Sequence, residues 1–175
     1  GGCSPSEVPS KELVERQGVT YKVNSEIPFT GTSVEYYIDT IIKDEFEERV
    51  LFKKVILKNG IRNGLYESFH PNSQVNVKGN YLDGKKDGLH ESYYENGQLE
   101  YKKNYKDGNE DGLHESYYEN GQLESKGNYL EGKIEDGLHE SYYEDGQLEY
   151  KKNYKDGKED GLHESYHANG QLGYK

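Results

Sequence analysis

The chain of 175 residues has a formal net charge of −11 and is only 31% hydrophobic, a composition that approaches that of disordered proteins. Its 18 tyrosines argue against disorder, because each ring can bury roughly 150 to 250 Å² while its hydroxyl stays in water. The acidic balance excludes the basic surface through which proteins bind nucleic acids and anionic membranes, and no apolar run approaches the roughly 20 residues that span a bilayer.

Residues 1–17 are polar and contain two prolines, a pattern typical of a flexible tether. The single cysteine, Cys3, cannot form an internal disulfide. The sequence Gly-Gly-Cys-Ser around it resembles the end of a bacterial lipoprotein cleavage site, in which the cysteine becomes the lipid-bearing first residue. We therefore expect lipid attachment at Cys3 and a protein at the cell envelope, lipid-anchored or secreted. The alternative is a stray cysteine in the tail of a cytoplasmic protein.

Residues 18–62 predict a divergent first repeat, which opens with a strand because apolar and polar residues alternate over 19–23. In this repeat Tyr37 and Leu51 lie 14 positions apart, against 5 for their equivalents in the regular repeat. We expect the added residues, near 38–50, to form an extended hairpin. It either caps the open end of the sheet or binds a partner.

Residues 63–175 are copies of one unit, DGLHESYYENGQLEYKKNYKDG. The copies begin at residues 63, 87, 111, 136 and 160, and a spacing of about 24 residues is typical of repeat arrays. Asn96-Gly97 and its equivalents favour a hairpin, because a type I′ turn needs positive φ at both central positions. Each copy is therefore predicted to be one hairpin with a fixed register.

The predicted register places Tyr94 opposite Leu99 and Ser92 opposite Tyr101. It also places a glutamate opposite a lysine in every copy: Glu67–Lys78, Glu91–Lys102, Glu115–Lys126, Glu140–Lys151 and Glu164–Lys175. Such pairs set the register more than they stabilise the sheet. Gly79 and Gly127 stand where the neighbouring copies have Lys103 and Lys152, and we expect the sheet to bend more sharply at every second copy.

The same register collects tyrosines and leucines into a ribbon on one face of the sheet. Tyrosine is enriched where interfaces carry binding energy, so we expect this ribbon to be a binding surface. Its members are Tyr94, Leu99, Tyr101, Tyr118, Leu123, Tyr143, Leu148 and Tyr150.

Three motifs suggest chemistry that their context does not support. Segments 79–85 and 127–133 have the spacing of a phosphate-binding loop, but neither is followed by serine or threonine. Segment 107–112 matches the opening of a calcium loop, but Tyr118 stands where a bidentate glutamate is needed. His-Glu-Ser recurs at 90–92 and in later copies, but on a strand the glutamate points away from the other two, which we interpret as half-exposed polar positions. We therefore predict no catalytic residue, no metal site and no cofactor.

The string YYENGQLEYKKNYKDG resembles the MORN repeat in its bacterial variant form, and IPFTG before the first copy is similar to the YwqK-type branch of that family. The resemblance covers about residues 19–175. It implies an all-β fold, an elongated single-layer antiparallel β-sheet of tandem hairpins. It also implies a binding or scaffolding surface without catalysis. Some members of the family are labelled antitoxins, and others are surface or secreted proteins.

These observations favour a non-enzymatic protein that offers a protein–protein interaction or scaffolding surface at the bacterial cell envelope. Carbohydrate or cell-wall binding is one alternative, because tandem aromatic hairpins also characterise cell-wall-binding repeats, although the chain has no tryptophan. A cytoplasmic antitoxin-like inhibitor of a partner protein is the other. Nucleic acid is not expected as a partner, and a membrane is expected only through a lipid on Cys3.

Overall fold

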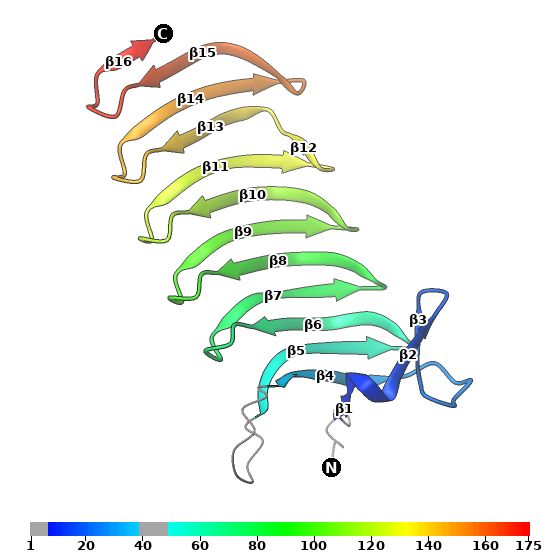
Figure 1. Ribbon diagram of the computed structural model, residues 1–175. Coiled ribbons are helices and arrows are strands. Elements are labelled where there is room, and N and C mark those ends of the chain that lie inside the picture. Colours follow the sequence, from blue (N-terminus) through cyan, green and yellow to red (C-terminus); the bar gives the residue numbers. More distant parts are fainter. Residues whose placement is uncertain (1–6, 39–48) are drawn as a thin grey trace, which may run out of the picture. The chain divides into compact units, whose positions relative to one another are not determined.

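The computed structural model describes residues 7–38 and 49–175. Apart from one 3-10 turn at Ser10–Glu12, the regular elements of these residues are β-strands. Consecutive strands of the repeats lie side by side as antiparallel hairpins (Figure 1). This arrangement confirms the predicted all-β array of tandem hairpins. The chain divides into two compact units, Gly1–Lys85 and Lys86–Lys175, so that the repeat beginning at Asn63 belongs with the N-terminal region.

The first unit contains a five-stranded sheet and a separate hairpin. The strands are β1 (Glu7–Pro9), β2 (Leu13–Arg16), β3 (Val19–Lys22), β4 (Gly31–Ile38), β5 (Arg49–Lys58), β6 (Ile61–Phe69) and β7 (Val75–Leu82). In the sheet their order is β1-β4-β5-β6-β7, and β2 pairs only with β3. All neighbours are antiparallel except β1 and β4, which run parallel.

The predicted flexible tether differs from the structure over residues 7–16, which form β1, the 3-10 turn and β2. Val8 of β1 is only 6% exposed and belongs to a small core with Phe29, Val55 and Leu57. The polar composition of this segment gives no local signal for the strand, whose partner β4 lies more than 20 residues further along the chain. Cys3 and the extended hairpin predicted near 38–50 lie, wholly or mostly, outside the described residues.

The β2–β3 hairpin is joined to the sheet through the turn between β5 and β6. Thr20 N donates to Gly60 O (2.9 Å), Phe29 N donates to Thr20 O (2.9 Å), and Gly60 N donates to Phe29 O (2.6 Å). A hollow of about 400 Å³ lies beside this junction, with Leu13 and Val55 among its lining residues. The hairpin therefore docks by main-chain hydrogen bonds around one glycine.

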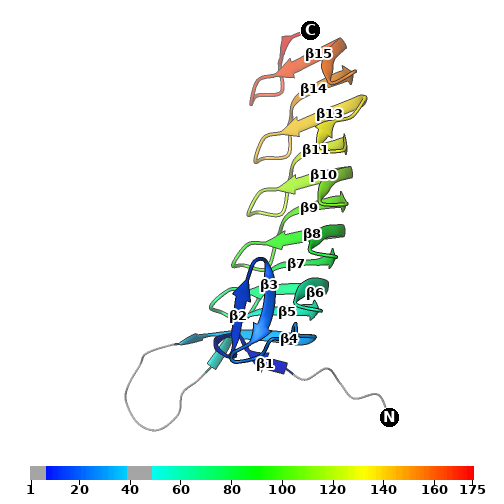
Figure 2. The same cartoon turned by 90° about the vertical axis from the view of Figure 1, so that its right-hand side faces the viewer.

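The second unit is a sheet of antiparallel hairpins, whose longer strands are curved along their length (Figure 1) and follow one another in chain order (Figure 2). Its strands are β8 (Lys85–Tyr93), β9 (Leu99–Lys106), β10 (Asn109–Tyr117), β11 (Leu123–Leu130), β12 (Lys133–Ile134), β13 (Gly137–Tyr142), β14 (Leu148–Lys155), β15 (Lys158–Tyr166) and β16 (Leu172–Tyr174). They are hydrogen-bonded in chain order, except that the short β12 pairs only with β11.

The hairpin turns at Asn-Gly are not of the predicted type. Of the two residues only the glycine has a positive φ, 82° at Gly97, and the same holds at the equivalent turns. Tyr94 N donates to Gln98 O and Gly97 N donates to Tyr94 O, each at 2.9 Å. This is the pattern of a type I turn that ends in a left-handed glycine. Asn96 acts through its side chain instead, since its Oδ1 accepts from Gln98 N at 2.8 Å.

Type I′ turns occur at the opposite ends of the strands. Both central residues have positive φ at Asp83-Gly84, Asp107-Gly108, Glu131-Gly132 and Asp156-Gly157. The longer turn also occurs at Asp145-Gly146, and a type I′ turn occurs at Glu131-Gly132. The turn type therefore follows the position in the repeat unit and not the choice of Asn or Asp before the glycine.

The register confirms most of the predicted pairs. Ser92 pairs with Tyr101 and Glu91 pairs with Lys102, and the first four predicted glutamate–lysine pairs are all in register. The prediction that Tyr94 lies opposite Leu99 is wrong, because a β-bulge after Ser92 brings Tyr93 opposite Leu99 instead. The bulge follows from the longer turn, which takes Tyr94 out of the strand.

Candidate functional site

The two faces of the second unit carry different side chains, because successive residues of a strand point to opposite faces. We call one the histidine face; it carries His90, Ser92 and their equivalents in later repeats. We call the other the leucine face; it carries Leu89, Glu91, Tyr93 and their equivalents. The recurrent His-Glu-Ser motif is therefore split between the two faces, as predicted.

Histidines and tyrosines alternate along the histidine face as a ladder of ring contacts. The ring centroids are separated by 5.0 Å for His90–Tyr105, 6.4 Å for Tyr105–His114, 4.2 Å for His114–Tyr129, 5.9 Å for Tyr129–His139 and 4.9 Å for His139–Tyr154. His90 is 2% exposed, Ser92 3% and His114 7%. The prediction of half-exposed polar positions is therefore wrong for His90, Ser92 and His114, whereas His139 and His163 are of intermediate exposure.

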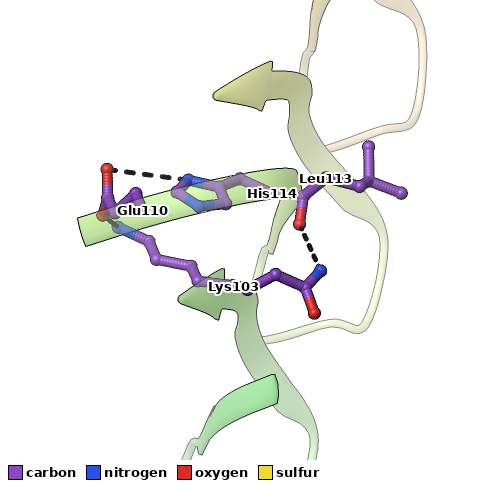
Figure 3. A network of polar contacts seen from close by, with 5 residues as sticks. Lys103, Glu110, Leu113 and His114 are labelled. Atoms are coloured by element: carbon purple, nitrogen blue, oxygen red, sulfur yellow. Dashed lines mark hydrogen bonds and ion pairs between the residues drawn. The ribbon is translucent and has the colours of Figure 1, made fainter. Parts of the chain in front are cut away.

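His114 is the best-defined member of the ladder (Figure 3). Glu110 Oε2 lies 3.8 Å from its Nδ1, and Glu110 Oε1 accepts from Lys103 Nζ at 3.1 Å. Burial lowers the pKa of His114 below its ordinary value, and Glu110 opposes that shift. Burial also lowers the pKa of His139. The Nε2 atoms of both imidazoles are buried and have no hydrogen-bond partner among the described residues.

The two lowered pKa values predict a loss of stability in mild acid. Below about pH 6.5 the unfolded chain binds protons at these histidines that the folded chain does not, so the stability present above that pH falls as the pH decreases. We expect the melting temperature of the protein to decrease steadily from pH 7.5 to pH 5.5. The double variant His114→Phe, His139→Phe keeps rings in the ladder and should show a flatter profile. An equal slope in both proteins would contradict the expectation.

A hollow of about 250 Å³ opens on the histidine face where the ladder crosses β11. Its lining includes His114, Ser125, Gly127, Ile134 and His139. A Cβ built on Gly127 would lie 2.0 Å from Nδ1 of His139, so the glycine makes room for that imidazole. That Gly127 bends the sheet stays a prediction. The structure shows that the absence of a side chain at Gly127 lets the His139 ring approach the backbone closely.

The leucine face carries a ladder of alternating glutamates and lysines. Each lysine lies between the glutamates of two repeats, and its short ion pair is formed with the following repeat: Lys102–Glu115 at 2.5 Å, Lys126–Glu140 at 2.5 Å and Lys151–Glu164 at 2.8 Å. Hydrogen bonds from Lys151 and then Tyr166 lower the pKa of Glu164 to about 2. The charges of this row therefore pair with each other across hairpins.

Beside the charged row, leucines occupy one repeated position. Leu89 is 44% exposed, Leu113 42% and Leu138 45%. Each is paired in register with an asparagine of the next strand, and two strand spacings separate successive leucines, roughly 9 to 10 Å. Leucines that reach solvent at the same position of three successive repeats make this row a candidate interaction surface.

The residues of the predicted tyrosine–leucine ribbon do not share one environment. Tyr101 and Tyr150 lie on the histidine face, with lysine ammonium groups 5.3 and 5.2 Å from their ring centroids. The leucines of the ribbon, Leu99, Leu123 and Leu148, are half-buried in register with Tyr93, Tyr117 and Tyr142.

The second tyrosine of each Tyr-Tyr dipeptide joins one repeat to the next. The hydroxyls of Tyr94, Tyr118 and Tyr143 donate to the backbone carbonyls of Tyr117, Tyr142 and Tyr166, at 2.8, 2.7 and 2.7 Å. Burial raises the pKa of Tyr94 and of Tyr118, so these hydroxyls stay protonated. We call this set the tyrosine clasps. Their half-buried hydroxyls connect successive repeats through these hydrogen bonds.

Within 7–38 and 49–175, histidine, cysteine, aspartate and glutamate side chains form no group of three or more that could hold a metal ion. The same part of the chain has no helix that is long and apolar enough to cross a membrane.

The repeat units also agree with a known family model. The model described as MORN repeat variant matches residues 62–83, 86–107, 110–131, 135–156 and 159–174, which is more than half of the chain. Each matched segment begins one residue before a predicted copy. A search of the curated proteins finds no match.

Proposed function

Because the chain belongs to the MORN repeat variant family, whose repeats are generally modules that bind proteins or membranes, we propose that it is a non-enzymatic protein-binding scaffold. The observation that carries this proposal is the exposed leucine row at Leu89, Leu113 and Leu138. The adjacent charges are already paired with each other, so a partner that covers the row has few unpaired ions to desolvate. The half-buried Tyr117 and Tyr142 beside them add amphipathic contact area.

The leucine row gives a direct test of protein binding. In the triple variant Leu89→Asn, Leu113→Asn, Leu138→Asn, each change removes about 1 kcal/mol of buried apolar contact with a partner, so affinity should fall on the order of 100-fold. The measurement is in-cell cross-linking of the tagged full chain, followed by mass spectrometry and titration of the partner recovered.

A matched control replaces exposed charges at the turns. Glu95, Glu119 and Glu144 are all exposed, and their change to glutamine alters neither the leucine row nor the ladder. We expect this control to recover the same partner as the unchanged protein. Equal recovery by the leucine variant, with an unchanged melting temperature, would refute the leucine face as the binding surface.

We also propose a location at the bacterial cell envelope, with a lipid on Cys3. The support is the Gly-Gly-Cys-Ser sequence at that position. Metabolic labelling with an alkyne fatty acid should mark the protein in a bacterial host, and the label should vanish in Cys3→Ser. The antitoxin-like alternative predicts an unlabelled protein in the cytoplasmic fraction, so the same experiment separates the two locations.

A further inference from the structure

Three positions of the histidine face change together in the repeat that contains β11. Ser125 stands where β9 and β14 have tyrosine, and Gly127 stands where they have lysine. Ile134, in register with Tyr129, stands where the repeats on either side have Glu110 or Glu159. The hollow of about 250 Å³ lies at these altered positions.

In the neighbouring repeats the same three positions form one filled, ion-paired group. The lysine lies over the tyrosine ring, with Nζ 5.3 Å from the centroid in the β9 repeat and 5.2 Å in the β14 repeat. It also donates to the glutamate, at 3.1 and 2.8 Å. The β11 repeat lacks both members of that ion pair, because Gly127 and Ile134 stand at the positions of the lysine and the glutamate.

The missing side chain has the size of one tyrosine. Each tyrosine of this row is flanked by serines on the strands beside it: Tyr101 by Ser92 and Ser116, and Tyr150 by Ser141 and Ser165. Ser125 is flanked in the same way, by Ser116 and Ser141. The neighbouring repeats thus show which ring fits above two such serines.

The walls of the hollow favour a neutral ring that carries a hydroxyl. Tyr129, Tyr154 and Ile134 offer apolar surface, while Ser116 and Ser125 place their hydroxyls 2.7 Å apart in its floor. His114 is 7% exposed and lines the hollow, and its Nε2 has no partner among the described residues. A small rotation of this imidazole would let a ligand hydroxyl satisfy it.

We propose that the hollow binds a phenol ring, that of a tyrosine side chain presented by a partner protein. The ring takes the place that Tyr101 and Tyr150 hold in the neighbouring repeats. The charged residues that also line the hollow are each ion-paired with another residue, so a charged side chain would find no unpaired counter-ion there; they are Lys103, Glu115, Lys126 and Glu140. A sugar ring has hydroxyls around its whole edge, which the apolar wall at Ile134 and Tyr154 would leave without partners. This site is on the face opposite the leucine row; the identity of the ring as that of a partner protein rests on the proposed protein-binding function, but the site does not depend on the leucine row.

The test is an NMR titration of the full chain, labelled with ¹⁵N, with p-cresol, the side chain of tyrosine. The amides of Ser116, Ser125 and Gly127 should shift with a dissociation constant in the millimolar range, roughly what so small a ligand can reach. Ser125→Tyr refills the place with the residue that two other repeats carry, so the fold is kept and the shifts should be lost. Ile134→Glu restores the charge of the other repeats and should weaken binding at least about 10-fold.

Two arms give the outcomes that would overturn the proposal. Methyl glucoside should cause no shift at these amides, and binding of the glucoside without binding of p-cresol would make the hollow a sugar site. Shifts by p-cresol that persist in both Ser125→Tyr and Ile134→Glu would place the ligand elsewhere. Leu113→Asn, on the other face, should bind p-cresol unchanged, so a failure of the leucine surface and a failure of this site are distinguishable.

Discussion

Gly60→Ala is expected to lower the free energy of unfolding of the first unit by roughly 3 to 5 kcal/mol, the range of changes that force atoms into backbone. A Cβ at this position would lie 2.6 Å from Thr20 O and 2.8 Å from Thr20 N, and 2.5 Å from Val19 Cγ1. Backbone atoms cannot move aside as a flexible side chain can. The substitution therefore separates the β2–β3 hairpin from the turn that it is hydrogen-bonded to.

Gly18→Ala is the matched control, because it isolates the cost of backbone conformation. Gly18 has φ 77° and Gly60 has φ 76°, but nothing lies within 4 Å of a Cβ built on Gly18. Its replacement should cost only about 1 to 2 kcal/mol of left-handed strain. Urea denaturation followed by circular dichroism measures both variants, and hydrogen exchange at Thr20 and Phe29 reports the hairpin itself. Equal losses for the two glycines would show that the docking contact contributes nothing.

The repeated part of the fold is predictable because its signals are local and occur many times. The spacing of the copies, the turn residues and the glutamate–lysine pairs all indicate the same hairpin, and the register follows. The turn type is not predictable from Asn-Gly alone, since the asparagine side chain can accept from Gln98 N and favour the longer loop. β1 is missed for another reason: its pairing with β4 joins segments far apart in the sequence.

The candidate site is less predictable, because its contacts cross from one strand to the next on the diagonal. The register places His90 opposite Lys103, yet the ring that packs against His90 belongs to Tyr105, two residues further along. Aromatic rings on one face can contact residues that are diagonal to them on the next strand. The sequence therefore contains the information needed to predict the contact between the histidine and the tyrosine of each repeat. His90 and His114 lie two strands apart, and this separation alone does not indicate that the ring of Tyr105 lies between them.

The two faces also differ in how strictly they repeat. On the leucine face, Leu89, Leu113 and Leu138 have nearly the same exposure, which suits a partner that follows the array. On the histidine face, the β11 repeat alone among those of the second unit combines Ser125, Gly127 and Ile134, which suits one ring at one place. The extended leucine row therefore follows from residues that repeat in every copy, whereas the small hollow beside β11 follows from residues that differ in one copy.

The triple variant Tyr94→Phe, Tyr118→Phe, Tyr143→Phe is expected to destabilise the second unit by about 3 kcal/mol. Each substitution removes one half-buried hydroxyl that donates to the backbone carbonyl of the next repeat. A hydrogen bond of this kind contributes about 1 kcal/mol, and clasps in separate repeats should add. The loss should appear as a lower urea midpoint with an unchanged slope, because the rings and the surface that they bury are retained.

The double variant Tyr101→Phe, Tyr150→Phe is the control for the tyrosine clasps. These hydroxyls form no hydrogen bond with the described residues, so their removal should change the midpoint little. An equal shift in both variants would mean that the hydroxyls act through solvation and not through the clasps. The comparison also bears on binding: if the clasp variant loses a partner only in proportion to its stability, Tyr94, Tyr118 and Tyr143 support the binding surface without contacting the partner.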